Sequence, residues 1–355
     1  MSFQLRIEPL GQTLDLAEGQ TLLDACLRAG VWLPHACCHG LCATCKVRVL
    51  EGEVEHGEAS PFALMDFERE EGRALACCAH AQSDLVIEAE IDDEPDALAL
   101  PVQDHVGRVV AIEQASLSVR ILRLQLERPM RFQAGQYINL EIPALAQRRA
   151  FSIASPPSRA DLLDLHVRQV PGGACTGWLH QQLAVGDRLP LAGPYGRFFV
   201  RRSAHGPDGR PLLFMAGGSG LSSPLAMILD LLEQGCRLPI TLVYGQRQRS
   251  ELYLHERLQA LAAAHANLRY LPALSDEPAG SGWMGARGLV HEVAGAHFGH
   301  DFSGHKAYLC GPPAMIDACL SSLMQGRLFE RDIHTERFLS AADAQRARSP
   351  VFRSV

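Results

Sequence analysis

Residues 36–45 read ACCHGLCATC, and a second cysteine-bearing run, residues 74–80, reads ALACCAH. Four of these cysteines, Cys37, Cys42, Cys45 and Cys77, have the C-x4-C-x2-C…C spacing of plant-type [2Fe–2S] proteins. Between Cys45 and Cys77 lie 31 residues. Four thiolates must converge on two irons while the backbone wraps closely around them, and Gly40 permits the turn that this needs. The motif predicts an iron–sulfur cluster and the transfer of single electrons.

Two other metal sites are compatible with part of this pattern. A zinc site of three cysteines and one histidine could form from the pairs at 42–45 and 77–80, but it leaves Cys37 unused. A Rieske cluster needs two Cys-x-His pairs. Cys37 and His39 resemble one pair, but Val47 stands where the second histidine is required. The plant-type cluster is therefore preferred to both metal sites and to reduced structural thiols without a metal.

Two further cysteines, Cys38 and Cys78, each adjoin a proposed ligand. Cys77 is preferred to Cys78 as the fourth ligand because it directly follows the strand-like run at 74–76.

The composition is that of a globular protein. A chain of 355 residues is too long for one ordinary core and suits two or three domains. No run of eighteen apolar residues occurs, and residues 1–6 lack the pattern of a secretory signal, so we expect no membrane span and no export. Eleven cysteines then indicate thiols and thiolate ligands in a reducing cytoplasm.

Acidic residues are concentrated near the N-terminus. Residues 1–93 hold 17 Asp and Glu against 6 Lys and Arg, whereas the remaining 262 residues hold 23 against 27. This field argues against nucleic-acid binding and favours docking to a basic protein surface or to the chain's own basic part. For any single carboxylate, a solvated face is an equally good explanation.

The pattern of apolar residues divides the chain into three parts. The first predicts a small mixed sheet over one helix, which Thr21 and Asp24 cap and Gly30 ends. Its expected strands are 5–8, 13–16, 45–50 and 85–91. Residues 92–97 read as a linker.

From about residue 103 to 200, short runs divided by Gly and Pro predict an antiparallel all-β domain, with strands at 106–111, 119–126 and 137–142. After Gly206 strands alternate with helices, which indicates a mostly parallel sheet covered on both faces. The expected strands are 212–216, 240–244, 268–272 and 307–310, and the expected helices are 224–232, 252–264, 288–294 and 313–324.

Two glycine-bearing turns follow strands of this third part. Residues 217–221 read GGSGL before a helix for which Ser223 is the expected N-cap and Pro224 the first turn. Such a loop suits a phosphate, although Ser223 replaces the last glycine of G-x-G-x-x-G. The run at 308–315 forms a second turn at the same sheet edge, where Cys310 is either a buried hydrophobe or a group beside a bound ring.

The β domain carries Arg149-Ala150-Phe151-Ser152, which alternates a cation, an aromatic ring and a hydroxyl along a strand. Alone it is an ordinary strand with a solvated arginine. The run GGACT at 172–176 adds a second turn of the phosphate-binding type.

Behind the cysteine motif, the ordered runs R-x-F-S at 149–152, G-G-x-G-L-S-S-P at 217–224 and C-G-P-P at 310–313 resemble the ferredoxin–NAD(P)H reductase superfamily in its ferredoxin-fused form. The resemblance covers essentially the whole chain. Longer runs are similar to the reductase component of bacterial multicomponent phenol hydroxylases: 57–65, 132–140 and 305–313.

The resemblance implies a multidomain fold. A β-grasp [2Fe–2S] ferredoxin domain would occupy 1–93 and a linker 94–102. An antiparallel β-barrel that binds FAD would occupy 103–205. A doubly wound α/β domain that binds NADH, with a C-terminal tail, would occupy 206–355.

The resemblance also implies roles for single residues. Arg149 would hold the FAD pyrophosphate, Phe151 would lie against the flavin, and Ser152 would hydrogen-bond near its reactive nitrogen. The phosphate site would be completed by Gly172, Gly173 and Thr176. The residues that position NADH would be Gly217, Gly218, Ser219, Gly220, Cys310, Gly311 and Pro312.

Phe338 matches an aromatic residue that covers the other face of the flavin in relatives. Ser152, Cys310 and Phe338 are therefore the candidate catalytic residues. The chain departs from the family pattern at Phe151, where many relatives carry tyrosine, and at Cys38, where glycine is expected.

The implied chemistry is electron transfer from NADH through FAD to the [2Fe–2S] cluster, and on to the diiron hydroxylase of a phenol or related aromatic monooxygenase. The coenzyme is implied to be NADH, although Arg247, Arg249 and Glu251 leave NADPH open on chemistry alone. A Rieske dioxygenase or another acceptor is the nearer alternative. A zinc-bearing binding protein without enzymatic activity is the distant one.

Overall fold

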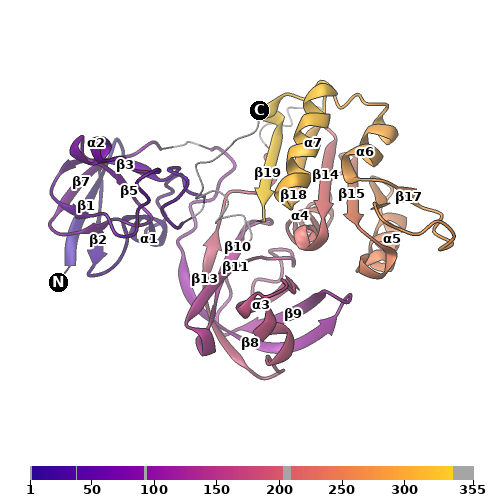
Figure 1. Cartoon of the computed structure of the whole chain (residues 1–355), viewed down its shortest axis with the longest axis horizontal. Helices are drawn as coiled ribbons and strands as arrows, with labels where there is room; N and C mark the ends of the chain where they lie inside the picture. Colours follow the sequence, from indigo (N-terminus) through magenta and orange to yellow (C-terminus); the bar gives the residue numbers. More distant parts are fainter. Residues whose placement is uncertain (1, 37, 92–93, 203–208, 339–355) are drawn as a thin grey trace. The chain divides into compact units, whose positions relative to one another are not determined.

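The computed structural model describes residues 2–36, 38–91, 94–202 and 209–338 (Figure 1). The chain forms two compact units, one within residues 1–103 and one that begins at Asp104. The predicted domain boundaries near 93 and 205 adjoin positions outside the described residues, so they stay predictions. Among the described residues, no helix has the length and apolar character needed to cross a bilayer.

The first unit is built on a five-stranded sheet in the order β2-β1-β7-β3-β5. Its strands are β1 (Ser2–Glu8), β2 (Gln12–Ala17), β3 (Lys46–Glu51), β5 (Arg73–Leu75) and β7 (Leu85–Glu88). A two-stranded sheet joins β4 (Val54–Glu55) to β6 (His80–Ala81). Strands β1 and β7 are parallel, and the other neighbouring strands of the five-stranded sheet pair antiparallel.

Helix α1 (Leu22–Arg28) packs its apolar residues inward, as predicted. The amide of Asp24 donates to Thr21 Oγ1 at 3.2 Å, and Gly30 has a φ of 78°, so both predicted helix ends are confirmed. The short helix α2 (Asp66–Glu70) was not predicted, and β7 ends three residues earlier than expected.

The second unit begins with a six-stranded sheet in the order β11-β10-β13-β8-β9-β12. Its strands are β8 (Gln103–Gln114), β9 (Val119–Leu126), β10 (Tyr137–Ile142), β11 (Gln147–Ser152), β12 (Leu162–Arg168) and β13 (Arg188–Tyr195). An antiparallel bridge between Ile153 and Leu165 brings the two edge strands together, which closes the barrel. Helix α3 (Ala174–Gln181) follows the turn at 172–173 and was not predicted.

The rest of this unit is a parallel sheet in the order β17-β16-β15-β14-β18-β19. Its strands are β14 (Leu212–Gly217), β15 (Ile240–Gln246), β16 (Leu268–Leu274), β17 (Ala286–Arg287), β18 (Lys306–Gly311) and β19 (Ile333–Arg337). Its helices are α4 (Ser222–Glu233), α5 (His255–Ala264), α6 (Val290–Phe298) and α7 (Pro313–Gln325).

Alternate residues of β14 enter two different cores. Phe214 packs with α4 and α5, whereas Leu213 and Met215 pack with α6 and α7, which lie together beside the strands in Figure 1. The sheet is therefore covered on both faces, which confirms the doubly wound prediction. From β14 the chain runs outward to β17 and then returns to β18, so the connection reverses between β14 and β18. Ligands bind at such a reversal in open α/β sheets.

The predicted N-cap at Ser223 is wrong. A 3₁₀ turn over Gly218–Leu221 leads directly into α4, which begins at Ser222. Ser223 therefore lies inside the first turn of the helix, and its hydroxyl donates to Glu336 on β19. Strand β19 itself was not predicted.

The loop after β14 makes a direct test of this packing possible. A Cβ on Gly220 would lie 2.4 Å from the carbonyl oxygen of Cys310, so Gly220→Ala must displace backbone. We expect it to destabilise the fold by about 2 kcal/mol and to lower the melting temperature by several degrees. Gly177 in α3 has open space around its Cα, so Gly177→Ala should leave the melting temperature unchanged or raise it. Equal melting temperatures for the two variants would contradict the packing.

Candidate functional site

The loop after β14 and the turn after β18 lie against each other. Ala216 pairs with Cys310 in the parallel register of these strands. A Cβ on Gly311 would lie 3.3 Å from both the nitrogen and the oxygen of Gly217. The predicted residues Gly217, Gly220, Cys310 and Gly311 are thus brought together at the carboxyl edge of the sheet, at its point of reversal.

A partly buried carboxylate joins this edge to the barrel. Glu336, opposite Cys310 in the pairing of β18 with β19, accepts hydrogen bonds at one oxygen from three groups. The donors are Ser223 Oγ at 2.7 Å, Ser152 Oγ at 3.3 Å and Cys310 Sγ at 3.5 Å. Two candidate catalytic residues, one from the barrel and one from the nucleotide-binding sheet, therefore meet at Glu336.

Burial changes the acid–base properties of this group. It raises the pKa of Glu336, although hydrogen bonds from Ser223, Cys310 and Ser152 act in the opposite direction. Burial, together with the neighbouring Glu336 carboxylate, raises the pKa of Cys310 well above its ordinary value, so the thiol stays protonated and donates.

The third candidate catalytic residue lies at the end of β19. The amide of Phe338 donates to the carbonyl of Gly311 at 3.0 Å, and the half-buried ring packs against the core beside α4. Pro312 follows Gly311 as the N-cap of α7. All three candidate catalytic residues therefore surround the Cys310 turn.

Two of the predicted phosphate-site elements are linked through Gln147. Its Oε1 accepts from Arg149 Nη2 at 2.8 Å and from Cys175 Sγ at 3.1 Å, at the start of α3. Thr176 Oγ1 accepts from the amide of Val170 at 3.0 Å and so holds the turn before α3. Phe151 is partly buried against the barrel core.

The geometry of two glycines fits bound phosphates. Gly172 has a φ of 73° and nothing within 4 Å of an added Cβ, and it lies in the turn that leads to the N-terminus of α3. Gly218 has a φ of 60°, and its nearest neighbour is the guanidinium of Arg168, 3.5 Å from an added Cβ. Open backbone beside an arginine is what an anionic ligand requires.

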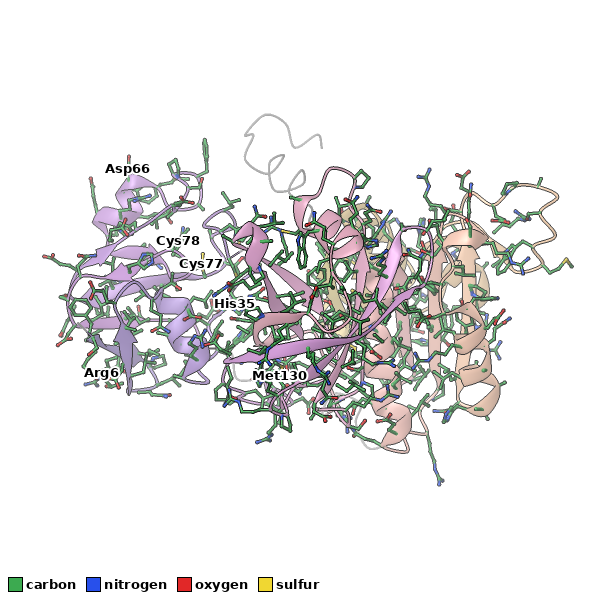
Figure 2. All side chains as sticks on the ribbon, turned by 90° about the horizontal axis from the view of Figure 1, so that it is seen from below. Arg6, His35, Asp66, Cys77, Cys78 and Met130 are labelled. Carbon is green, nitrogen blue, oxygen red and sulfur yellow. The ribbon has the colours of Figure 1, made fainter. Side chains whose placement is uncertain are left out.

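The cysteines lie in the first unit. Figure 2 labels Cys77 and Cys78, which follow β5 and whose sulfurs are 3.6 Å apart. A hydrogen bond with Cys77, together with burial, raises the pKa of Cys45, so these two side chains adjoin. Cys42 is exposed, and Cys37 lies outside the described residues.

The donor set in the described part of this unit is incomplete without Cys37, and no group of three metal-binding side chains is found over those residues. Thiols of Cys45 and Cys77 that adjoin, on backbone turned by Gly40, still fit a thiolate-bound cluster.

Sequence reasoning missed Glu336, Gln147 and Arg168. The run Ile333-His334-Thr335-Glu336-Arg337 carries the β-branched residues Ile333 and Thr335 after a short turn, which is the signal that could have revealed β19. No local signal marks Gln147, because its role depends on the distant start of α3.

Three family models match the chain in succession. They are a 2Fe–2S iron–sulfur cluster binding domain over residues 5–82, an oxidoreductase FAD-binding domain over 106–200 and an oxidoreductase NAD-binding domain over 214–320. This order, with the fold above, defines an iron–sulfur flavoprotein oxidoreductase that uses a [2Fe–2S] cluster, FAD and NADH.

Relatives that match over their full length show which kind of iron–sulfur flavoprotein this is. The chain is 56% identical to the phenol 2-monooxygenase reductase component DmpP of Pseudomonas sp. (strain CF600) and 54% identical to the phenol hydroxylase P5 protein of Acinetobacter pittii (strain PHEA-2), covering all of each chain. The crystal structure of the Amycolatopsis cytochrome P450 reductase GcoB matches with a TM-score of 0.85 and 35% identity, over 96% of this chain and 99% of that one. The chain belongs to the family of phenol hydroxylase reductase components.

Glu336 gives the stability of the protein a dependence on pH that can be measured. Because folding raises its pKa, the folded chain holds this proton more tightly than the unfolded chain. The free energy of unfolding should therefore fall as pH rises from the ordinary glutamate pKa of about 4.5 through the raised value. Glu336→Gln should lose this slope, as measured by urea unfolding from about pH 5 to pH 8. Glu256→Gln, at the exposed start of α5, serves as the control. Parallel slopes for wild type and Glu336→Gln would contradict the burial of the carboxyl group.

Proposed function

We propose that the chain delivers electrons from NADH, through FAD and its [2Fe–2S] cluster, to the oxygenase component of a phenol or related aromatic monooxygenase. The observation that carries this proposal is the meeting of Ser152, Cys310 and Phe338 around one turn, because flavin and nicotinamide must approach each other for hydride transfer. The full-length identity to two phenol hydroxylase components supports the choice of acceptor.

FAD, when bound, supplies the chemistry that neither of the other two groups has, since NADH donates hydride and an iron–sulfur cluster accepts only single electrons. The protein has to orient the two rings and handle one proton. A hydride carries two electrons and one proton, so after both electrons have left for the cluster the proton must leave as well. Ser152 and Glu336 provide a hydrogen-bonded route for it.

The remaining site residues have binding roles in this proposal. Arg149, Thr176 and the turn of Gly172 and Gly173 hold the FAD pyrophosphate, while Phe151 lies against the flavin and Phe338 covers it. NADH is positioned by Gly217, Gly218, Ser219, Gly220, Cys310, Gly311 and Pro312. Arg168 joins this group because it is the nearest cation to Gly218.

The cluster ligands in this proposal are Cys37, Cys42, Cys45 and Cys77. The contact between Cys45 and Cys77 supports Cys77 over Cys78 as the fourth ligand. A reducing cytoplasm suits these thiolates.

The acceptor has one serious alternative. Related reductases of the same architecture are described for an aromatic O-demethylase and for carbazole 1,9a-dioxygenase. A Rieske dioxygenase or a cytochrome P450 therefore remains the second candidate acceptor. The distant zinc-bearing alternative does not account for the FAD- and NAD-binding matches.

An anaerobic visible spectrum tests the internal route and the choice of ligand together. The purified protein should show flavin and [2Fe–2S] bands that bleach on addition of NADH. Cys77→Ser should lose the cluster bands and keep the flavin bands, whereas Cys78→Ser should keep both. A colourless or NADH-inert wild type would overturn the function. If Cys78→Ser lost the cluster and Cys77→Ser kept it, the fourth ligand would be Cys78 and not Cys77.

The preference for NADH depends on carboxylates at the ends of β15 and β16. Glu251, one of the residues considered from sequence, accepts from the hydroxyls of Ser116 at 2.8 Å and Ser118 at 2.6 Å. It is therefore engaged with the barrel. Asp276 is exposed just beyond β16, 3.8 Å from Arg247, where its charge would disfavour a 2′-phosphate and accept from a ribose hydroxyl.

Asp276→Ser should raise the ratio of kcat/KM for NADPH to that for NADH by about tenfold, because the carboxylate no longer repels the phosphate and Arg247 is released to bind it. Ferricyanide reduction measures both coenzymes in the same assay. Glu256→Gln, a change of charge elsewhere on this unit, should leave the ratio unchanged. A ratio for Asp276→Ser equal to that of the wild type would remove Asp276 from coenzyme selection.

A further inference from the structure

Three large apolar side chains lie exposed within six residues of the first unit. Phe62 is 67% exposed, Met65 48% and Phe67 55%. The two residues between the first pair, Ala63 and Leu64, are buried at 4% and 0%. The segment is thus held by its buried residues and presents the other three to solvent, and we call Phe62, Met65 and Phe67 the apolar patch.

The apolar patch adjoins the loop that carries the cluster cysteines. The amide of Ser60 donates to the carbonyl of Gly40 at 3.0 Å, between the proposed ligands Cys37 and Cys42. A Cβ on Gly40 would lie 3.1 Å from Ala59 Cα and 2.8 Å from Cys78 Sγ. Electron transfer requires a short path, and the chain segment of the apolar patch is in contact with the cluster loop.

The rim of the apolar patch is acidic. Asp66, which Figure 2 labels on α2, is exposed, as are Glu70 and Glu71. Two nearby cations are engaged with the same unit: Lys46 bonds Glu68 at 2.5 Å, and Arg69 Nη2 donates to the carbonyl of Ala59 at 3.2 Å. Residues 1–93 as a whole hold 17 acidic and 6 basic residues, so the negative field extends beyond the rim.

We propose that the apolar patch and its rim of Asp66, Glu70 and Glu71 form the docking surface for the electron acceptor. The occupant is a protein with an apolar depression ringed by lysine and arginine. Aromatic side chains at the centre of an interface supply most of the affinity, and charges at the rim raise the rate of encounter. A small surface of this kind suits a complex that must separate after each electron. The inference rests on the proposed function.

The test uses the full-length holoprotein and two acceptors. One is the oxygenase component of the phenol 2-monooxygenase of Pseudomonas sp. (strain CF600). The other is cytochrome c, a small basic haem protein. Phe62→Ala combined with Phe67→Ala should raise the apparent KM for each acceptor about tenfold, with kcat within about twofold of wild type.

The matched control is Phe329→Ala in the second unit, since Phe329 is also 67% exposed. It should leave the KM for both acceptors unchanged. Asp66→Asn combined with Glu70→Gln should weaken the dependence of kcat/KM on ionic strength, because rim charges act through the encounter rate. Reduction of ferricyanide, and anaerobic reduction of the cluster by NADH without any acceptor, should match wild type in every variant.

The readouts separate this inference from the function on which it rests. An unchanged KM in the double Phe variant overturns the docking surface. Slower cluster reduction without acceptor assigns the apolar patch to the flavin barrel. Dimers that the wild type forms in solution and the double Phe variant does not form assign it to a second copy of the chain; either result also overturns the inference. A wild type that reduces cytochrome c but not the oxygenase refutes the proposed acceptor, and the docking surface is then judged on cytochrome c. A wild type that cannot reduce its own cluster refutes the proposed function itself.

Discussion

The carboxylate of Glu336 is the constraint on which the redox site depends. Removing even part of a carboxylate from water is costly unless donors surround it, and here the donors come from three elements: β11 of the barrel, α4 and β18. To satisfy this charge, the end of the barrel strand has to lie against the carboxyl edge of the parallel sheet. The hydrogen bonds that make the carboxylate tolerable therefore also bring the flavin-side serine to the turn that holds Cys310.

Other contacts fix the same approach from a different side. Glu251 accepts from Ser116 and Ser118 in the hairpin of β8 and β9. The hydroxyl of Tyr253 lies 3.1 Å from the Nδ1 of His166 in β12, and it donates to the carbonyl of Gly218 at 3.4 Å. Burial lowers the pKa of His166 to about 4, so this ring is neutral near pH 7. The barrel and the nucleotide-binding sheet are thus joined by polar contacts with few alternative partners, which fixes their geometry more specifically than apolar packing alone.

Sequence patterns were most informative where the relevant interactions are local or the spacing is strict. The cysteine spacing, the cap at Thr21 and the strands at 119–126 and 137–142 needed only neighbouring residues, and the three-part fold followed from them. The N-cap at Ser223 was wrong because a 3₁₀ turn extends the helix and a distant carboxylate takes the hydroxyl. Strand β19, and with it Glu336, was missed because pairing with β18 is visible only in three dimensions. Helix α3 was missed because its glycines read as a turn.

The two units hold different parts of the electron route. The second unit joins the flavin and nicotinamide residues around one turn, and the first unit carries the cluster cysteines beside an exposed apolar patch. The central claim is that Ser152 and Glu336 act as one unit in releasing the proton when the reduced flavin gives up its electrons, and a double-mutant cycle tests it directly. Stopped-flow rates of flavin reoxidation, after anaerobic reduction with NADH and mixing with ferricyanide, would be measured for Ser152→Ala, Glu336→Gln and the double variant. We predict that the double variant is little slower than the slower single variant, because either change breaks the same hydrogen-bonded path. Losses that multiply in the double variant would contradict the account.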